Sequence, residues 1–226
     1  MKHNSAIATA LFVGFLLESS VVSATPIIDQ EFIPNAGTLA EASIQPGASG
    51  PSYGQTFTVG ISGRLVGADL ALDAVRPGRA LNNVLVEVTT TLGGFPTSTV
   101  LGNGTIPGAS IPLWFSSGLF SHVDFLSAPA VTAGQQLALL FFGEGNLTDD
   151  PNILVQNSPD VLYPGGQAVI FASGAWHPAV DFFGGWPGSD NFWFRTYVIV
   201  PEPSTFPLLA SGLASVGILR RRRKKA

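Results

Sequence analysis

The chain of 226 residues contains no cysteine, so it can form neither a disulfide nor a thiolate metal site. It has only three histidines, His3, His122 and His177, and they lie in unrelated segments. This distribution excludes a zinc site built from several histidines. The fold therefore has to be stabilised by packing alone, and the sequence predicts neither a bound metal nor a cofactor.

Positive charge is scarce in residues 25–200, which contain no lysine and only four arginines. The same segment has 13 Asp and Glu, and four positive against 13 negative charges leave it at about −9. Six of the 11 cationic side chains lie instead in the final seven residues. Because nucleic-acid binding requires clustered Lys or Arg, we exclude a nucleic-acid partner.

Long helical patterns are also missing from residues 25–200, where Gly and Pro are frequent and no window of ten or more residues keeps a 3.6-residue apolar period. Short runs rich in β-branched, Leu and aromatic residues take their place, bounded by turn-forming clusters. They predict an all-β fold, a single antiparallel, jelly-roll-like β-sandwich over residues 52–199. The clearest runs are 55–59, 64–72, 83–91, 121–126, 135–142, 168–172 and 191–199.

Several of these runs alternate with a period of two, which predicts one dry and one wet face. Residues 135–142 are apolar throughout after Gln136, as expected of a strand in the middle of the core. Residues 25–51 and 143–159 show no period, so we expect an irregular lead-in and a long loop. The alternating apolar sets are Val84, Val86 and Val88; Val66, Ala68, Leu70 and Leu72 against Asp69 and Asp73; and Val123 and Phe125 against His122 and Asp124.

The first 24 residues have the pattern of a secretory signal peptide. Lys2 and His3 open it, and the apolar run that follows, 6–17, is too short to span a bilayer. Small residues precede the bond between Ala24 and Thr25, where we expect cleavage.

The tail, residues 200–226, predicts a membrane anchor. Pro201, Glu202 and Pro203 end the last strand, because proline cannot donate to a sheet ladder. Residues 206–219 are apolar, small or Ser and predict one short transmembrane helix. The cations after this helix keep its end in the cytosol and place the body outside; they are Arg220, Arg221, Arg222, Arg223, Lys224 and Lys225.

This order of Pro-Glu-Pro, apolar helix and arginine-rich end resembles the PEP-CTERM sorting domain of Gram-negative bacteria. The resemblance implies processing by an exosortase near residues 201–203 and an association with exopolysaccharide and biofilm. It also implies a precursor held in the inner membrane with its body in the periplasm, and a final place at the cell surface or in the extracellular matrix. A plain tail anchor without processing remains an alternative.

The string 50–54 matches the G-x-S-x-G of a hydrolase, and Ser52 could be combined with His177 and with Asp160 or Asp181. That nucleophile turn must follow a strand and open a helix, whereas here coil precedes it and a strand follows. We therefore expect no enzyme, and a secreted hydrolase is the weaker alternative.

The oxygen-rich loop 144–152 could chelate calcium, but the order of its oxygen-bearing residues does not match an EF-hand, and a solvated acidic loop is the simpler interpretation.

Aromatic residues crowd into 176–197, where core packing explains most of them. Trp176 and Trp186 lie in Gly-rich segments and are the best candidates for exposed stacking platforms, which makes a glycan-binding module the main alternative function.

The body also resembles the "choice-of-anchor" β-sandwich domains of anchored bacterial surface proteins, for which no catalytic residues are assigned. The features that carry this resemblance are 53–57, 131–134, 163–166, Trp176 and 190–197.

Overall fold

The structure, a computed structural model, confirms the all-β class. All seven predicted segments contain strands, and every ladder between the strands is antiparallel. Helical structure in the described part is limited to two 3-10 turns, η1 (Gly108–Ser110) and η2 (Ala179–Asp181). The described residues are 24–34, 40–44, 52–74, 82–113, 120–144, 153–158, 161–181 and 191–201.

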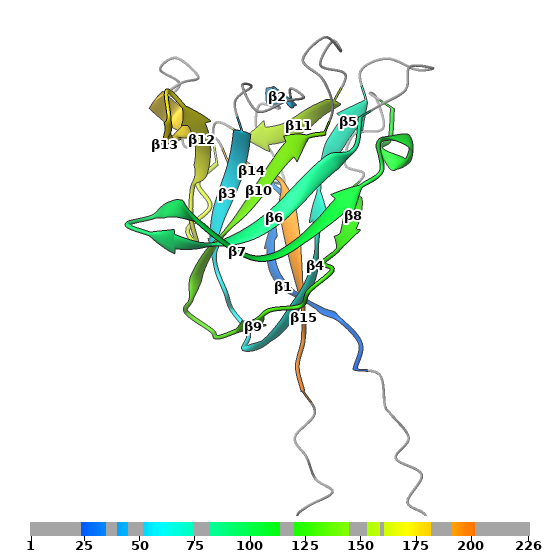
Figure 1. The fold of residues 1–226 in the computed structure, drawn as a ribbon, viewed down its shortest axis with the longest axis vertical. Helices are drawn as coiled ribbons and strands as arrows, with labels where there is room; N and C mark the ends of the chain where they lie inside the picture. Colours follow the sequence, from blue (N-terminus) through cyan, green and yellow to red (C-terminus); the bar gives the residue numbers. More distant parts are fainter. Residues whose placement is uncertain are drawn as a thin grey trace, which may run out of the picture.

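One layer contains a five-stranded sheet with the strand order β1-β15-β4-β8 and with β9 added to β4. The first and last strands of the body are thus direct neighbours. In Figure 1, β1 begins and β15 ends at the lower end of the body. The strands are β1 (Ile27–Phe32), β15 (Phe194–Ile199), β4 (Gly63–Leu70), β8 (Ser121–Asp124) and β9 (Ala130–Val131).

A smaller sheet continues this layer toward the upper end. Its central strand, β11, enters where β4 and β15 part, because the Gln156 N–H donates to the Ala71 carbonyl and the Trp193 N–H donates to the Gln156 carbonyl. The two sheets therefore form one wall. The strands are β14 (Asn191–Phe192), β11 (Ile153–Ser158), β2 (Ala40–Ile44) and β5 (Leu72–Ala74), with β5 and β2 both paired to β11.

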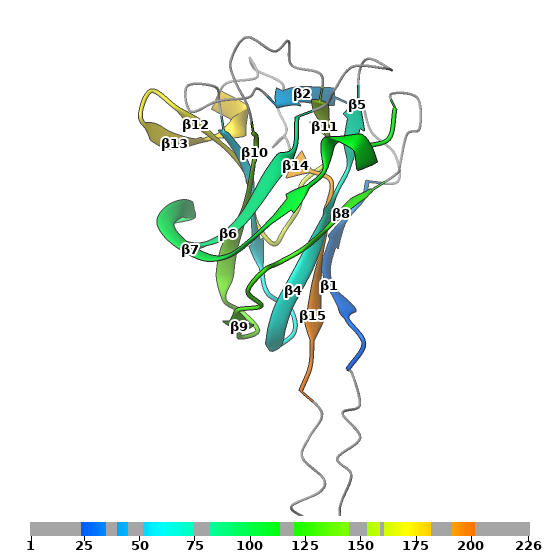
Figure 2. The ribbon, with the colours of Figure 1, turned by 45° about the vertical axis from the view of Figure 1, so that its right-hand side comes forward.

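The opposite layer is a six-stranded sheet with the order β13-β12-β3-β10-β6-β7. β10 lies inside it between β3 and β6, and its Leu137, Leu139 and Phe141 are fully buried, as its apolar sequence predicts. Figure 2 shows the two layers from the side. The strands are β13 (Ala175–Pro178), β12 (Ala168–Ala172), β3 (Ser52–Thr58), β10 (Gln136–Gly143), β6 (Val84–Leu92) and β7 (Phe95–Ile106).

The core between the layers is rich in aromatic rings, which explains most of the aromatic residues near the C-terminus of the body. Phe192 makes edge contacts with Tyr53 and Phe141, with ring centroids 5.7 and 5.0 Å apart. Phe57 and Phe194 meet across the layers at 6.0 Å. These contacts join the two layers into a β-sandwich. The jelly-roll connectivity stays a prediction.

The close contact between β7 and β8, at one side of the sandwich, depends on a glycine. A Cβ on Gly104 of β7 would overlap the carbonyl oxygen of Asp124 and come within 2.5 Å of Val123 Cγ2. Only a residue without a side chain allows β7 to pass this close to β8, so Gly104 brings the edges of the two layers together.

Two predictions about irregular segments are wrong. The expected lead-in 25–51 contains β1 and β2, and the expected long loop 143–159 contains β11. The apolar–polar alternation of β1 is interrupted, because its register with β15 shifts between Ile28 and Gln30, which places a bulge at Asp29. β2 has one large apolar residue, and β11 has a short apolar run, 153–155, followed by three polar residues; the two strands pair with each other.

The face assignment of β4 is also partly wrong. We expected Val66 on the dry face, but Leu65 is fully buried and Val66 is only partly so, because the register with β15 shifts between Tyr197 and Val198. Asp69 does lie on the face away from the core, opposite His122, but it is only 6% exposed, and Asp73 is 2% exposed. The bulge and the surrounding structure thus override the simple alternation.

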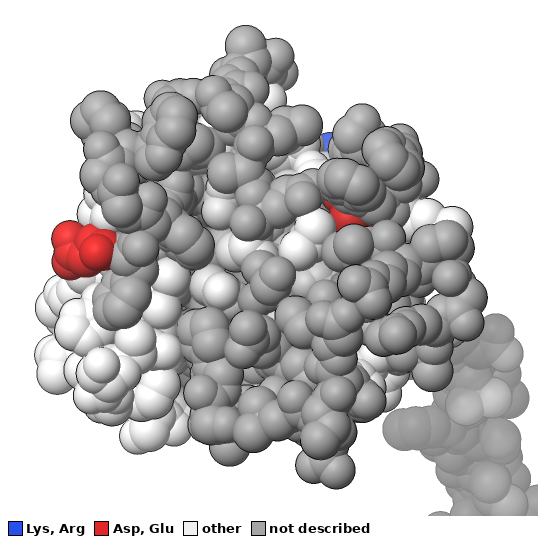
Figure 3. Space-filling model, turned by 90° about the horizontal axis from the view of Figure 1, so that it is seen from above, with Lys and Arg blue, Asp and Glu red and all other residues white. Residues whose placement is uncertain are grey.

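In the part of the chain that the structure describes, no helix combines the length and the apolar character needed to cross a membrane. The predicted signal segment 1–23 and the predicted transmembrane helix 206–219 lie outside the described residues. Figure 3 views the end of the body that is uppermost in Figure 1, where the described side chains in view are mainly uncharged.

Candidate functional site

Four charged or titratable side chains form a row across the five-stranded sheet, on the face that points away from the core (the outer face). Glu31 of β1 lies opposite Arg195 of β15, Arg195 lies opposite Asp69 of β4, and Asp69 lies opposite His122 of β8. Directly opposed side chains on antiparallel strands have Cβ atoms about 4.5–5.5 Å apart. The order of acid, base, acid and base therefore brings each charge beside an opposite one.

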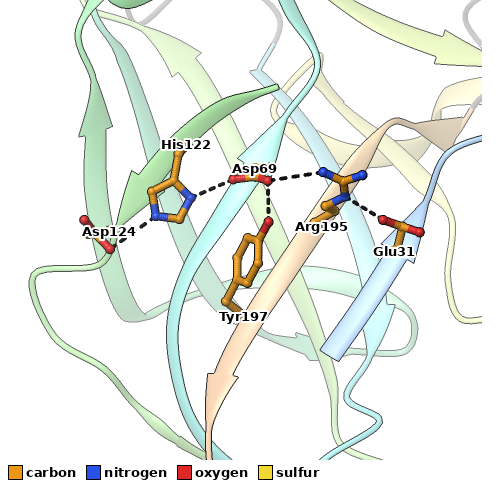
Figure 4. Close-up of polar contacts among 6 residues, drawn as sticks. All are labelled: Glu31, Asp69, His122, Asp124, Arg195 and Tyr197. Atoms are coloured by element: carbon orange, nitrogen blue, oxygen red, sulfur yellow. Dashed lines mark hydrogen bonds and ion pairs between the residues drawn. The ribbon is translucent and has the colours of Figure 1, made fainter. Parts of the chain in front are cut away.

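Asp69 is the centre of this arrangement (Figure 4). Its Oδ1 lies 2.6 Å from His122 Nδ1, its Oδ2 accepts a hydrogen bond of 2.5 Å from the Tyr197 hydroxyl, and Arg195 Nη1 is 3.8 Å from the same Oδ2. The Asp69 side chain is only 8% exposed. We call the whole set the polar network: Glu31, Asp69, His122, Asp124, Arg195 and Tyr197.

Two outer contacts complete the polar network. Arg195 Nε donates to Glu31 Oε2 at 2.5 Å, and His122 Nε2 lies 3.2 Å from Asp124 Oδ1. Exposure differs sharply along it, since the His122 side chain is 51% exposed and that of Asp124 is 89% exposed. The network thus has a buried anchor, Asp69, and groups at its edge that water or a ligand can reach.

The pKa values of two members follow from these contacts. Partial burial of His122 opposes its protonation, but hydrogen bonds with Asp69 and Asp124, and their negative charges, outweigh this and raise its pKa. Both ring nitrogens face carboxylates that only accept, so the protonated ring satisfies both. Burial, and then the hydrogen bond to Asp69, raise the pKa of Tyr197.

All members of the polar network except Glu31 line an open hollow of about 600 Å³ on the outer face. Pro26, Val66 and Phe120 supply its apolar walls. The Arg195 guanidinium lies 4.4 Å from the centre of the Phe120 ring, a cation–π contact. Gly67 of β4 allows β8 to approach closely, because a Cβ there would lie 2.6 Å from the Val123 carbonyl oxygen and 3.2 Å from His122 Cε1.

The groups that line the hollow can hydrogen-bond to a ligand. Its described lining has no Ser, Thr or Cys, and both nitrogens of His122 are engaged by carboxylates. Within the described ranges, no group of three or more His, Asp or Glu is placed to hold a metal ion. The side chains can accept and donate hydrogen bonds to a ligand.

The residues of the hydrolase alternative lie in elements that do not form the required turn. Ser52 is the first residue of strand β3, His177 lies in strand β13, and Asp181 lies in η2. A nucleophile elbow needs a strand before the serine and a helix after it, whereas a strand follows Ser52. Asp160 lies outside the described residues.

Trp176, a candidate glycan contact, is partly exposed on the β12–β13 hairpin, at the edge of the six-stranded sheet. It lies opposite Phe171, which is 38% exposed, and the ring centroids are 5.3 Å apart. The hairpin turns tightly through Ser173 and Gly174, which both have positive φ. Trp186, the other candidate, lies outside the described residues.

The remaining candidates lie at the ends of the body or in loops. At the expected signal cleavage bond, Ala24 is partly exposed and Thr25 is exposed. Pro201 is exposed beyond β15, while Glu202, Pro203 and the basic end 220–225 lie outside the described residues. So does most of the acidic loop 144–152, although Glu144 is described and accepts a hydrogen bond from Asn83 at 3.1 Å. The solvated acidic loop stays the prediction for this segment, with calcium binding as its alternative.

Sequence reasoning missed the polar network as a site. It placed Asp69, His122 and Asp124 on polar strand faces but did not connect them with Glu31 or Arg195. The available signal was a charged residue at a face-exposed position in each of four strands. Their pairing depends on register between residues as far apart as 31 and 195, which a single sequence does not reveal.

Comparison with known protein families gives a match to the tail. Residues 200–224 match the PEP-CTERM protein-sorting motif, which includes Pro201, Glu202 and Pro203. A comparison of the chain with curated protein sequences gives no significant match. The motif marks the chain as an exported, membrane-anchored precursor that is sorted through exosortase-related processing for the cell surface.

Proposed function

We propose that the protein is a non-enzymatic component of the cell surface or extracellular matrix, associated with exopolysaccharide and biofilm and delivered by its PEP-CTERM tail. The single observation that carries the proposal is the match of residues 200–224 to the sorting motif. The inner membrane holds the precursor with its body in the periplasm, and exosortase processing near the motif then releases or re-anchors the body.

The architecture of the body supports this role. β1 and β15 are antiparallel neighbours, so the described chain enters and leaves the sandwich at the same end (Figure 1). Val200 and Pro201 are exposed just beyond β15, which makes the start of the motif accessible to a protease. A body attached at this end presents its outer face and its opposite end to the surroundings.

Fractionation of the native host tests the proposal. The full chain should appear in the surface or matrix fraction, whereas a variant with Pro201, Glu202 and Pro203 all replaced by Ala should accumulate uncleaved in the inner membrane. Pro178→Ala is the control, because it replaces a proline of β13 that lies away from the motif, and it should be sorted normally. Equal sorting of the triple variant and the wild type would contradict the proposal.

A glycan-binding module is the second candidate, and the paired rings of Phe171 and Trp176 favour it. Two aromatic side chains that project together from an edge hairpin offer a platform on which a sugar ring can stack. If this hairpin is the recognition site, Trp176→Ala loses the glycan-array binding that wild type shows. Leu92→Ala removes another exposed apolar residue, 80% exposed at the end of β6, and should bind normally. Binding that survives Trp176→Ala and Trp186→Ala would reject both tryptophans.

A further inference from the structure

We propose that the hollow on the outer face is a binding site for a neutral saccharide, with Asp124 and Arg195 as its direct polar contacts. The inference deepens the glycan-binding candidate and rests on it, but it assigns recognition to a different place from the Trp176 hairpin. The hollow measures about 600 Å³, within the range of about 300–1,000 Å³ typical of small-molecule sites.

The groups around the hollow are held in place before any ligand arrives. The buried carboxylate of Asp69 fixes His122 through Nδ1 and Tyr197 through its hydroxyl. Glu31 and the Phe120 ring hold the guanidinium of Arg195 from two further sides. Side chains that are already ordered lose little conformational entropy when a ligand binds, and such pre-organisation favours affinity.

Hydrogen-bonding capacity remains at the accessible edge of the polar network. Asp124 is 89% exposed and contacts His122 through one carboxylate oxygen, so its other oxygen can accept from a ligand hydroxyl. Arg195 has five N–H donors, and its described contacts with Glu31 and Asp69 involve Nε and Nη1. A hydroxyl group, which both donates and accepts, matches this pair.

The charges select a neutral ligand. Glu31, Asp69 and Asp124 carry three negative charges against Arg195 and the titratable His122, so the polar network is net negative and repels an acidic saccharide. Arg195 also lines the hollow, so an amine bound there would lie close to its guanidinium. The walls formed by Val66 and Pro26 suit the apolar C–H face of a sugar ring.

The test is a glycan array probed with the full chain in mild detergent, carrying neutral gluco-, galacto- and manno-oligosaccharides beside uronic-acid oligosaccharides. Wild type should bind at least one neutral class and no uronic-acid class. Asp124→Ala should weaken that binding at least tenfold without unfolding the protein, because the side chain is almost fully exposed. Val66→Phe, which adds bulk to the wall of the hollow, should do the same.

Two controls separate this site from the hairpin. Asp181→Ala removes another exposed carboxylate, in η2, and should bind as wild type. Trp176→Ala should also keep its binding. Neutral-sugar binding that survives both Asp124→Ala and Val66→Phe overturns the proposal, and loss in Trp176→Ala alone would move recognition to the hairpin. Binding to no neutral saccharide overturns this proposal, and binding to no saccharide of either kind overturns both glycan assignments, whereas the sorting proposal is judged separately by fractionation.

Discussion

Gln55 connects the two layers of the sandwich from inside the core, and its replacement by Leu should destabilise the protein strongly. The side chain is fully buried on β3. Its Oε1 accepts the Phe192 N–H at 2.9 Å, and its Nε2 donates to Asn191 Oδ1 at 3.2 Å. Both partners belong to β14 in the opposite layer, so a single amide holds the end of that strand against the six-stranded sheet.

The cost of Gln55→Leu can be worked from these contacts. Leucine fills nearly the same space but leaves the Phe192 N–H without its acceptor in the core, and a buried unsatisfied donor costs about 1–3 kcal/mol. The lost hydrogen bond to Asn191 adds about 0.5–1.5 kcal/mol. We expect the free energy of unfolding to fall by about 2–4 kcal/mol. The melting temperature should fall by about 4–16 °C, since one kcal/mol corresponds to about 2–4 °C in a domain of this size.

Urea unfolding of the full chain in mild detergent, followed by tryptophan fluorescence, measures this loss. Trp193 directly follows Phe192 and reports on the affected strand. Gln136→Leu is the matched control, because it makes the same change at an exposed position of β10 and should alter stability by no more than about 0.5 kcal/mol. A loss below about 1 kcal/mol for Gln55→Leu would refute the reasoning.

Two further predictions concern the outer face and the closure of the sandwich. Because the pKa of His122 is raised above its ordinary value of 6.5, its contribution to stability is fully present below pH 6.5 and is lost as the pH rises through the folded-state pKa. The melting-temperature difference between wild type and His122→Gln should therefore be larger at pH 5.5 than at pH 8.5, and a difference that grows with pH would contradict the assigned contacts. Gly104→Ala should cost about 1–3 kcal/mol in urea unfolding, because its Cβ meets β8. Gly93→Ala, with φ of +61° and no atom within 4 Å of its Cβ, should cost only about 1 kcal/mol, and an equal loss in both would argue against the close approach of β7 and β8.

The strands that sequence predicts correctly are those whose local pattern agrees with their environment. Val84, Val86 and Val88 are fully buried on β6, and Val123 is buried while His122 and Asp124 are exposed on β8. In these strands one face packs on the core and the other meets water, so the alternation is visible in the residue types themselves.

The missed strands take their structure from partners that are distant in sequence. β2 is rich in small or polar residues, the second half of β11 is polar, and the two strands pair with each other. The buried Gln156 and Asn157 of β11 resemble loop residues in a single sequence. The face of Val66 was missed for a related reason, since a bulge against β15 has no local signal.

The candidate site was harder to predict from the sequence than the fold. The sorting motif of the tail lies in contiguous residues, so it can be identified from the sequence alone. The polar network joins residues from four strands, and Asp69 becomes its centre only when β8 and β15 lie on either side of β4. Strand register therefore decides the site, and register is the feature that local patterns specify least.

Mass spectrometry of the mature protein from its native host tests the central claim most directly, because it reports both ends of the chain at once. We predict a surface or matrix protein whose N-terminus is Thr25 and whose C-terminus lies near residues 201–203, without the apolar segment and the basic end. An intact chain that retains residues 1–24 and 204–226 and remains in the cytosol would contradict the account.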